Sequence, residues 1–208
     1  MSGLDPAALR TDVAQRKRGA VLENAILAAA YDELCEVGYT AFSVEQVAAR
    51  AGTGKASIYR RWPTRQELLL DALSAGLPMP AQCGLEPVLD DSVTTADALR
   101  GMAGDIGRVL TSPAGAAMRA VKYEAASNPE LAQLVDERFQ APRRTALLGL
   151  LRRGVSRGEV RADAVSCLVA DVLPAMVLHQ LLLQPETGSA PDITAIVEEI
   201  VIPLVAVR

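Results

Sequence analysis

The sequence predicts an all-α protein, and three observations lead to that prediction. Half of the 208 residues are hydrophobic but only 3% are aromatic, and the composition is dominated by alanine and leucine, which form helices readily. Apolar residues recur at helical spacing through most of the chain. We find no segment with the alternation of apolar and polar residues that is typical of a half-buried strand.

The first 76 residues are predicted to form four helices. Ser43 and Gln46, three residues apart, fit a capping box that opens the second helix, and Gly52 is the residue expected to end it. Thr64 and Glu67 fit a second such box at the start of the fourth helix. The predicted helices cover about 15–37, 43–52, 54–61 and 64–76.

The segment 77–94 contains three prolines and two aspartates, and it is predicted to be a loop between two modules. The C-terminal module, 95–208, is also predicted to be helical. Ser112 and Asn128 each precede a proline, as a cap residue before the first helical position does. The long helix after Asn128 is expected to kink at Pro142. Further helices are predicted near 95–110, 163–184 and 191–206.

The formal net charge of −4 is unevenly distributed. Residues 10–65 carry nine basic and six acidic side chains, whereas residues 77–208 carry twelve basic and sixteen acidic ones. A small basic module joined to a larger acidic one is compatible with nucleic-acid binding by the first. Three widely spaced cysteines indicate neither a disulfide framework nor a cysteine metal site. With no signal-like N-terminus and no uninterrupted apolar span, a cytoplasmic protein is expected.

The stretch "ARAGTGKASIYRRWP", residues 49–63, contains a Gly-Lys pair of the kind that holds phosphate. A nucleotide-binding loop requires an earlier glycine and a hydroxyl residue after the lysine. Those two positions are Ala49 and Ala56 here. The required residues are therefore missing, and a turn between two DNA-binding helices is the better interpretation.

Two short helices joined by a tight glycine turn, with small residues where they cross, predict a helix-turn-helix. Ala48 would allow the helices to approach closely, and Gly52 would make the turn. The exposed face of the second helix then offers hydrogen-bond donors and cations over about two turns, which suit phosphates and base edges in a major groove. These residues are Lys55, Ser57, Tyr59, Arg60 and Arg61.

The run "AILAAAYDELCEVGYTAFSVEQVAARAGTGKASIYRRWPTRQELLLDAL" resembles the N-terminal domain of the TetR family of bacterial transcriptional regulators. The later run "SPAGAAMRAVKYEAASNPELAQLVDERFQAPRRTALLGLLRRGVSRGEVRADA" is similar to a ligand-domain subgroup of that family. The resemblance implies a DNA-binding domain over 1–76, with a basic arm at about 1–18, and a ligand-binding and dimerisation domain over 95–208. It also implies a homodimeric repressor that leaves a palindromic DNA operator when a small molecule binds.

The resemblance assigns roles by position. Lys55, Ala56 and Ser57 fall where the family reads base edges, and Tyr59 matches its phosphate-contacting tyrosine. Arg61 and Trp62 replace a common histidine and phenylalanine, so the operator sequence does not carry over from relatives. The arm could reach a minor groove or be disordered, and single cations of this face could be merely solvated. The predicted DNA contacts are Ser43, Thr53, Lys55, Ala56, Ser57, Tyr59, Arg60, Arg61 and Arg65.

Trp62 is expected in the core instead, because it follows the Ile58 face and would lock the recognition helix in place. The helix over 164–184 is apolar almost all round, so it should be buried on both sides. One side is predicted to meet a second subunit, together with the last helix, and two-fold symmetry would match a palindrome. The predicted dimer residues are Leu168, Leu173, Val177, Leu181, Ile193, Ile196, Val197, Ile200 and Leu204.

The C-terminal module contains only Tyr123 and Phe139 as aromatic residues. Two rings can hardly hold a flat cationic molecule by stacking, so an aliphatic or weakly polar small-molecule effector is expected. For each lining residue, an ordinary place in the core is the alternative, and His179 is expected to be packed or at an interface. The predicted ligand-binding residues are Ile106, Val109, Met118, Tyr123, Leu147, Val172, Met176 and His179.

An enzyme is not expected, because the chain lacks a nucleophile elbow and a dinucleotide-binding glycine motif. A single histidine excludes histidine dyads and multi-histidine metal sites, so no catalytic residue, metal or cofactor is predicted. The alternative function is a helical protein–protein adaptor whose ligand domain no longer senses a small molecule. An adaptor would explain the apolar C-terminal helices but not the clustered cations and tyrosine at 55–61.

Overall fold

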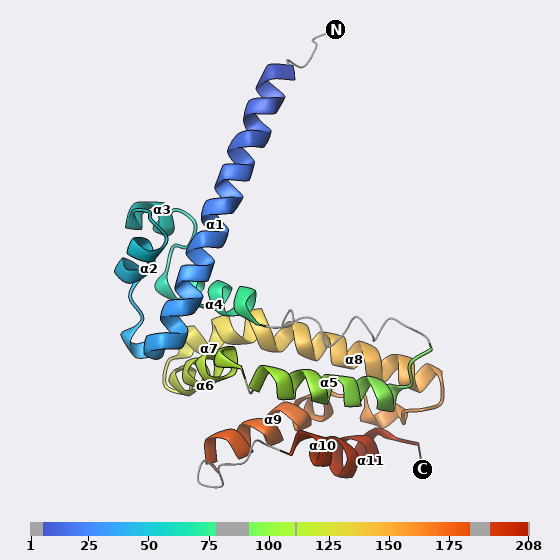
Figure 1. Ribbon diagram of the computed structural model, residues 1–208. Helices are drawn as coiled ribbons and strands as arrows, with labels where there is room; N and C mark the ends of the chain where they lie inside the picture. Colours follow the sequence, from blue (N-terminus) through green and yellow to red (C-terminus); the bar gives the residue numbers. More distant parts are fainter. Residues whose placement is uncertain (1–5, 78–91, 111, 184–191, 208) are drawn as a thin grey trace. The chain divides into compact units, whose positions relative to one another are not determined.

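The computed structural model describes residues 6–77, 92–110, 112–183 and 192–207, with side chains for 19–77, 92–110, 112–180 and 192–207. Within these ranges the chain is helical apart from turns and one isolated antiparallel bridge between Val160 and Ala206. The predicted all-α fold is confirmed (Figure 1). The chain divides into two compact units, Met1–Gly76 and Leu77–Arg208. Among the described helices, none combines the length and the apolar character needed to span a membrane.

The first unit holds four helices. Gly38 interrupts the first of them with a φ of 74°, a backbone conformation that glycine adopts without the steric cost of a side chain. The first helical segment therefore ends before Gly38, near residue 37 as predicted, and a short second segment continues to Ala41. The helices are α1 (Pro6–Ala41), α2 (Val44–Arg50), α3 (Lys55–Tyr59) and α4 (Arg65–Gly76).

Both predicted helix caps of the first unit are present. The Ser43 hydroxyl accepts a hydrogen bond from the backbone N–H of Gln46 at 3.4 Å, and the Thr64 hydroxyl accepts one from Glu67 at 3.2 Å. Each bond satisfies an N–H that has no partner within its own helix. The two caps fix where α2 and α4 begin.

The core of the first unit lies between α1 and α4, which pack against each other. Ile26 and Leu34 of α1, and Leu68 and Leu73 of α4, are at most 1% exposed. Burial of each such side chain contributes about 1.5–3 kcal/mol relative to leaving it exposed. This packing supports the two short helices, which are too short to be stable alone.

The second unit is built from longer helices with the predicted caps at Ser112 and Asn128. The Ser112 hydroxyl accepts from Gly115 N–H at 3.3 Å, and the Asn128 side-chain oxygen accepts from Leu131 N–H at 3.1 Å. Proline occupies the first position of the helix after each cap. The helices are α5 (Thr95–Leu110), α6 (Pro113–Ala125), α7 (Pro129–Val135), α8 (Ala141–Ser156), α9 (Cys167–Leu183), α10 (Ile193–Ala195) and α11 (Ile202–Val205).

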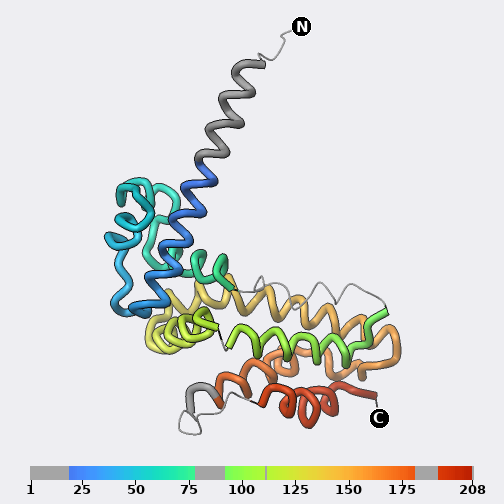
Figure 2. The backbone as a smooth tube through the Cα atoms, viewed as in Figure 1, coloured from blue at the N-terminus to red at the C-terminus, as the bar shows by residue number. Residues whose placement is uncertain are grey.

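Two turns of π-helix precede prolines in this unit. Asp136–Gln140 joins α7 to α8 just before Pro142, and Ile196–Val201 joins α10 to α11 just before Pro203. Proline lacks the N–H that an α-helix requires, and a π-turn is one way to absorb the lost bond. A π-turn therefore lies directly before Pro142, where the sequence predicts a kink, and Figure 2 traces the backbone of this unit.

The core of the second unit collects side chains from α5, α8, α9 and the last helices. Leu99, Leu150, Leu151 and Val197 are each 1% exposed. The C-terminal end is tied to the turn after α8, because the N–H of Arg161 donates to the Val205 carbonyl at 3.0 Å.

Candidate nucleic-acid interface

The turn between α2 and α3 is closed by a glycine in the left-handed region. Gly52 has a φ of 62°, and its N–H donates to the Ala49 carbonyl at 3.3 Å. The Thr53 N–H donates to the Ala48 carbonyl at 3.0 Å. These two bonds form a Schellman motif that satisfies the last carbonyls of α2. Gly52 thus sets the direction in which the chain enters α3.

One side of α3 is anchored in the first unit. Ile58 is 1% exposed and Trp62 is 5% exposed, and the Trp62 indole N–H donates to the Asp71 carboxylate of α4 at 2.8 Å. The prediction that Trp62 belongs to the core is confirmed. Anchoring of this side leaves the opposite side of the segment open to solvent. Its exposed residues are Lys55, Ala56, Tyr59 and Arg60.

The positive charge at the start of α3 is partly neutralised by α2. The Lys55 ammonium nitrogen lies 2.5 Å from a carboxylate oxygen of Glu45. Their hydrogen bond lowers the pKa of Glu45 and raises the pKa of Lys55. Both side chains are more than half exposed, so the pair is screened by water and breaks readily. A DNA phosphate or base would compete with Glu45 for Lys55.

The two arginines at the end of α3, Arg60 and Arg61, make different contacts. Arg61 folds back, and its guanidinium donates to the carbonyl and the hydroxyl oxygen of Ser57 at 2.9 and 3.0 Å. Arg60 is exposed and forms no hydrogen bond or ion pair with the described part of the chain. Thr53 and Ser43 are partly buried, and Ser43 is also the cap of α2. The cation that stands free at this end is therefore Arg60.

Arg65 is engaged within the first unit. Its guanidinium carbon lies 4.8 Å from the centre of the Tyr39 ring and 5.8 Å from that of Phe42. It also donates a hydrogen bond to the Tyr39 carbonyl. Stacking of a guanidinium on aromatic faces is attractive, so Arg65 joins the start of α4 to the end of α1. Its predicted contact with the DNA backbone stays a prediction beside this visible structural role.

Sequence reasoning missed a charged cluster that joins α1 to α2. Glu33 is only 3% exposed, and Arg50 lies 3.2 Å from its carboxylate. The guanidinium of Arg50 also forms two hydrogen bonds with Glu36, at 3.0 and 2.6 Å, which lower the pKa of Glu36. The three-residue spacing of the two glutamates on one helical face was the available signal. This cluster joins α2 to α1.

Comparisons with known proteins agree with this geometry. Residues 26–72 match the family model described as "Bacterial regulatory proteins, tetR family", and residues 89–200 match "Tetracyclin repressor-like, C-terminal domain". The regulator YdeS of Bacillus subtilis is 30% identical over 168 residues, which cover 81% of this chain and 82% of YdeS. The chain belongs to the TetR family.

Other members of the TetR family are similar over most of their length. The DNA-binding transcriptional repressor TetR of Mycobacteroides abscessus is 32% identical over 172 residues, covering 80% of this chain and 85% of the relative. A solved TetR-family regulator of Mesorhizobium loti superposes with a TM-score of 0.70 at 18% identity, covering 91% and 99% of the two chains. SmeT of Stenotrophomonas maltophilia superposes with a TM-score of 0.65 at 19% identity, covering 89% and 91%.

Membership of the TetR family decides between the function classes. The protein is a helix-turn-helix transcriptional regulator that binds DNA, and it is not an enzyme. The alternative of a protein–protein adaptor is favoured by none of these matches. The residues that contact DNA are not named by any of them, so the nine predicted contacts remain predictions.

The predicted ligand residues of the TetR-type C-terminal unit differ in how far they are exposed. Leu147 is buried, and Ile106, Val172 and Met176 pack partly buried against the core. Val109 and Met118 are partly buried as well. Tyr123 is 74% exposed and His179 is exposed, so neither points into the interior of this unit. His179 is thus not packed within its own unit, and the other half of the prediction, a place at an interface, stays a prediction.

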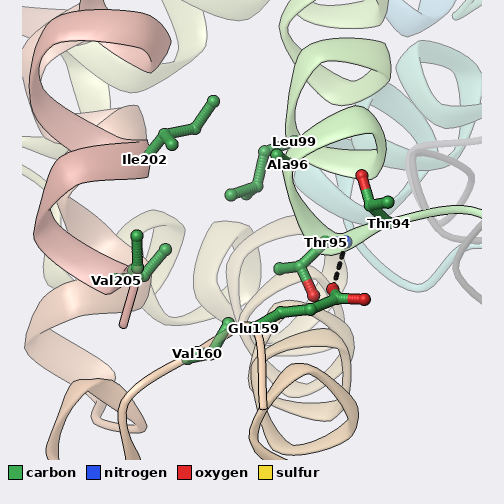
Figure 3. A pocket seen from close by; sticks show the side chains of 9 residues that line it. Thr94, Thr95, Ala96, Leu99, Glu159, Val160, Ile202 and Val205 are labelled. Carbon is green, nitrogen blue, oxygen red and sulfur yellow. Dashed lines mark hydrogen bonds between the residues drawn. The ribbon is translucent and has the colours of Figure 1, made fainter. Parts of the chain in front are cut away.

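One cavity of the TetR-type unit, of about 90 Å³, lies between the start of α5 and the C-terminal helix (Figure 3). It is lined by Leu99, Val160, Ile202 and Val205 among others, and by Glu159 and Thr95 on its polar side. None of the predicted ligand residues lines it. Pockets for drug-sized molecules are about 300–1,000 Å³, so this cavity is too small for such a ligand.

The predicted dimer residues fall into two groups. Leu173, Val177, Ile193, Ile196 and Val197 are at most 6% exposed and belong to the core of their own unit, so they do not form a surface. Leu168 is 79% exposed and Ile200 is 39% exposed. Leu204 is partly buried, and the side chain of Leu181 lies outside the described residues. α9 therefore packs one apolar side onto its own unit.

Proposed function

We propose that this protein is a homodimeric repressor that binds a palindromic operator through two copies of α3. The observation that carries the proposal is the exposed face of Lys55, Tyr59 and Arg60, opposite the buried Ile58. A short helix with cations and donors on one side suits a major groove, and a symmetric dimer presents two of them one helical turn or more apart. Repression as the output is supported by the relative from Mycobacteroides abscessus, which is named as a repressor.

The proposed DNA contacts divide into two kinds. Lys55 and Ser57 would hydrogen-bond to base edges, and the methyl group of Ala56 would lie against them, because these residues begin the recognition helix. Tyr59 and Arg60, together with Thr53 and Ser43 at the turn and cap, would contact phosphates. Arg61 would act at this face only after releasing Ser57. Base contacts would set sequence preference, and phosphate contacts would set affinity for DNA in general.

The dimer is proposed to form through the outer side of α9. Leu168, Ala175 and His179 are exposed, and their spacing of seven and four residues places them on one face of a helix. An exposed leucine at the start of such a face is the kind of apolar anchor that a second copy would cover. Two-fold pairing would place this same face of both copies in contact.

The effector is proposed to bind within residues 95–208 and to release the operator. SmeT, which shares the fold, was solved in complex with triclosan, so a protein of this architecture holds a small molecule. The partly buried Ile106, Met118 and Met176, with the buried Leu147, would surround the aliphatic part of a ligand. We place the protein in the cytoplasm, where an operator is accessible.

The test begins with selection of bound fragments from the source genome. The selected operator is then titrated with the wild-type protein and with the Lys55→Ala, Ser57→Ala and Tyr59→Phe variants. Lys55→Ala and Ser57→Ala should change which sequences bind, at about 1–3 kcal/mol per lost base contact. Tyr59→Phe should weaken binding to all sequences similarly.

Arg108→Ala provides the matched control, since it removes an exposed positive charge from the second unit. It should retain full affinity for the operator. If Lys55→Ala and Tyr59→Phe both bind as tightly and as specifically as the wild type, the recognition face is wrongly assigned.

A further inference from the structure

Two cations of the second unit are partly buried without an acidic partner. Lys122 of α6 and Arg143 of α8 are both partly buried, and neither forms an ion pair within the described part of the chain. Other arginines of this unit are paired, for example Arg100 with Glu198 at 2.6 Å. Lys122 is also the only lysine between residues 77 and 208. A charge that is removed from water without a partner is unfavourable.

These two cations lie on the helix faces that carry the predicted ligand residues. Lys122 follows Met118 by four residues on α6, and Arg143 precedes Leu147 by four residues on α8. Residues four apart share one side of a helix. α6 packs against α7, which continues through the π-turn into the start of α8. The electrostatic effect of Arg143 on Lys122 shows that the two cations lie near each other.

The local electrostatics leave this positive charge largely uncompensated. Burial, with a smaller contribution from the neighbouring Arg143, lowers the pKa of Lys122 to about 8. Burial also lowers the pKa of Arg143, against the opposing effect of Asp171. The Asp171 carboxylate, however, is bound by Arg144, whose Nε lies 3.2 Å away. Arg143 itself donates to the Gln140 side chain at 3.1 Å.

We propose that Lys122 and Arg143 hold an anionic group of the effector, so that the effector is an aliphatic molecule with a carboxylate. A guanidinium binds a carboxylate through two parallel hydrogen bonds, and an ammonium adds a compact charge. The apolar side chains four residues away on both helices would contact the aliphatic part. This inference rests on the proposed function as an effector-controlled repressor, but it concerns binding alone and is tested without DNA.

The experiment is isothermal titration calorimetry of the full-length protein with octanoate, octan-1-ol and octylamine. Wild-type protein should bind octanoate at least tenfold more tightly than octan-1-ol or octylamine. Lys122→Met and Arg143→Gln should each lower the affinity for octanoate at least tenfold. Arg152→Gln, which removes an exposed charge further along α8, is the matched control and should bind octanoate like the wild type.

Two further readouts separate recognition from a structural role. Lys122→Met keeps the apolar stem and removes a desolvated charge, so the Tm of the ligand-free variant should equal or exceed that of the wild type. A bound carboxylate should raise the pKa of Lys122 again, so that octanoate binding at pH 8 takes up protons. Titration in buffers of different ionisation enthalpy measures this uptake, which Lys122→Met should abolish.

The proposal is overturned if octanoate and octan-1-ol bind equally well, if none of the probes binds, or if Lys122→Met retains full affinity for octanoate. Proton uptake that persists in Lys122→Met would also contradict it. Operator binding measured in parallel keeps the two proposals distinct. A protein that binds its operator but shows one of these results refutes the anion site alone, whereas a protein that fails to select DNA refutes the proposed function.

Discussion

Lys55, at the start of α3, is paired with Glu45. The carboxylate lies on the neighbouring helix of the same motif, so it reduces the positive charge that the face offers to phosphates. Glu45 also interacts with the Ser43 hydroxyl at 3.3 Å. A single acidic side chain would thus moderate affinity for any DNA, so that base contacts would carry a larger share of the preference for the operator.

Replacing Glu45 by glutamine should raise affinity for operator and unrelated DNA alike, by about two- to fivefold. Glutamine removes a charge that repels phosphate and releases Lys55. Fluorescence anisotropy at one fixed salt concentration measures both affinities, and Glu23→Gln, an exposed change of equal charge on α1, is the control. Weaker binding by Glu45→Gln would mean that Glu45 positions Lys55 for contact instead of restraining it.

At the scale of elements, Gly52 determines how α2 and α3 are joined. A Cβ atom built at this position would meet nothing within 4 Å. The requirement for glycine is therefore conformational and comes from its φ of 62°. This separates the cost of backbone strain from the cost of a steric clash.

Gly52→Ala should lower the free energy of unfolding of the first unit by about 1–2 kcal/mol. Gly52→Asn should cost less, because asparagine tolerates the left-handed region better than alanine. Urea denaturation followed by circular dichroism measures both variants, and operator affinity should fall in the same order. Equal stability of Gly52→Ala and the wild type would show that the turn relaxes to another conformation.

The start of α5 depends on a carboxylate from the turn after α8. Glu159 accepts a hydrogen bond from the backbone N–H of Thr95 at 2.7 Å (Figure 3), and Thr95 is 3% exposed. The hydrogen bonds from Thr95 lower the pKa of Glu159, with a smaller contribution from Arg157. The negative charge also lies where the helix dipole favours it.

A carboxyl group whose folded pKa is lowered stabilises the fold above its ordinary pKa of about 4.3 and loses this effect as the pH falls through the folded value. Glu159→Gln should therefore be less stable than the wild type by about 1 kcal/mol at neutral pH. The difference should shrink as the pH falls below the ordinary pKa and through the lowered pKa of folded Glu159. Thermal unfolding over a series of pH values from neutral downward checks this, with the exposed Glu199→Gln as control, and a pH-independent difference would contradict it.

For the whole molecule, the proposed pairing through the exposed apolar surface of α9 would decide whether two subunits can face one operator. Leu168 is 79% exposed, so a charge at this position adds little cost within a single subunit. In a dimer the same charge would be buried against its symmetry mate, which is unfavourable. The effect of a substitution thus depends on assembly and not on folding.

Leu168→Glu should convert a dimer into a folded monomer and lower operator affinity at least tenfold, because the two half-sites are then bound independently. Sedimentation at micromolar concentration measures the state of assembly. Val207→Glu, at another exposed apolar position, should leave the dimer intact. A wild-type protein that sediments as a folded monomer, or a Leu168→Glu variant that stays dimeric, would refute the α9 interface.

The sequence by itself determined the features that depend on neighbours along the chain. The helix caps are local because each cap side chain bonds to a backbone N–H three residues away; they lie at Ser43, Thr64, Ser112 and Asn128. The turn at Gly52 is local because glycine adopts a positive φ without a steric cost. The anchored side of α3 also followed from its spacing. The family was evident for the same reason, since its motif is contiguous.

Tertiary structure decided which side of an apolar helix is buried. On α9, periodicity could not separate the buried Leu173 from the exposed Leu168, because apolar residues surround the helix. Nor could it predict that Arg65 stacks on Tyr39, or that Lys122 lacks an acidic partner, since these facts depend on residues distant in sequence. Long-range packing determines desolvation and charge pairing, and therefore where this protein can bind a ligand or a second subunit.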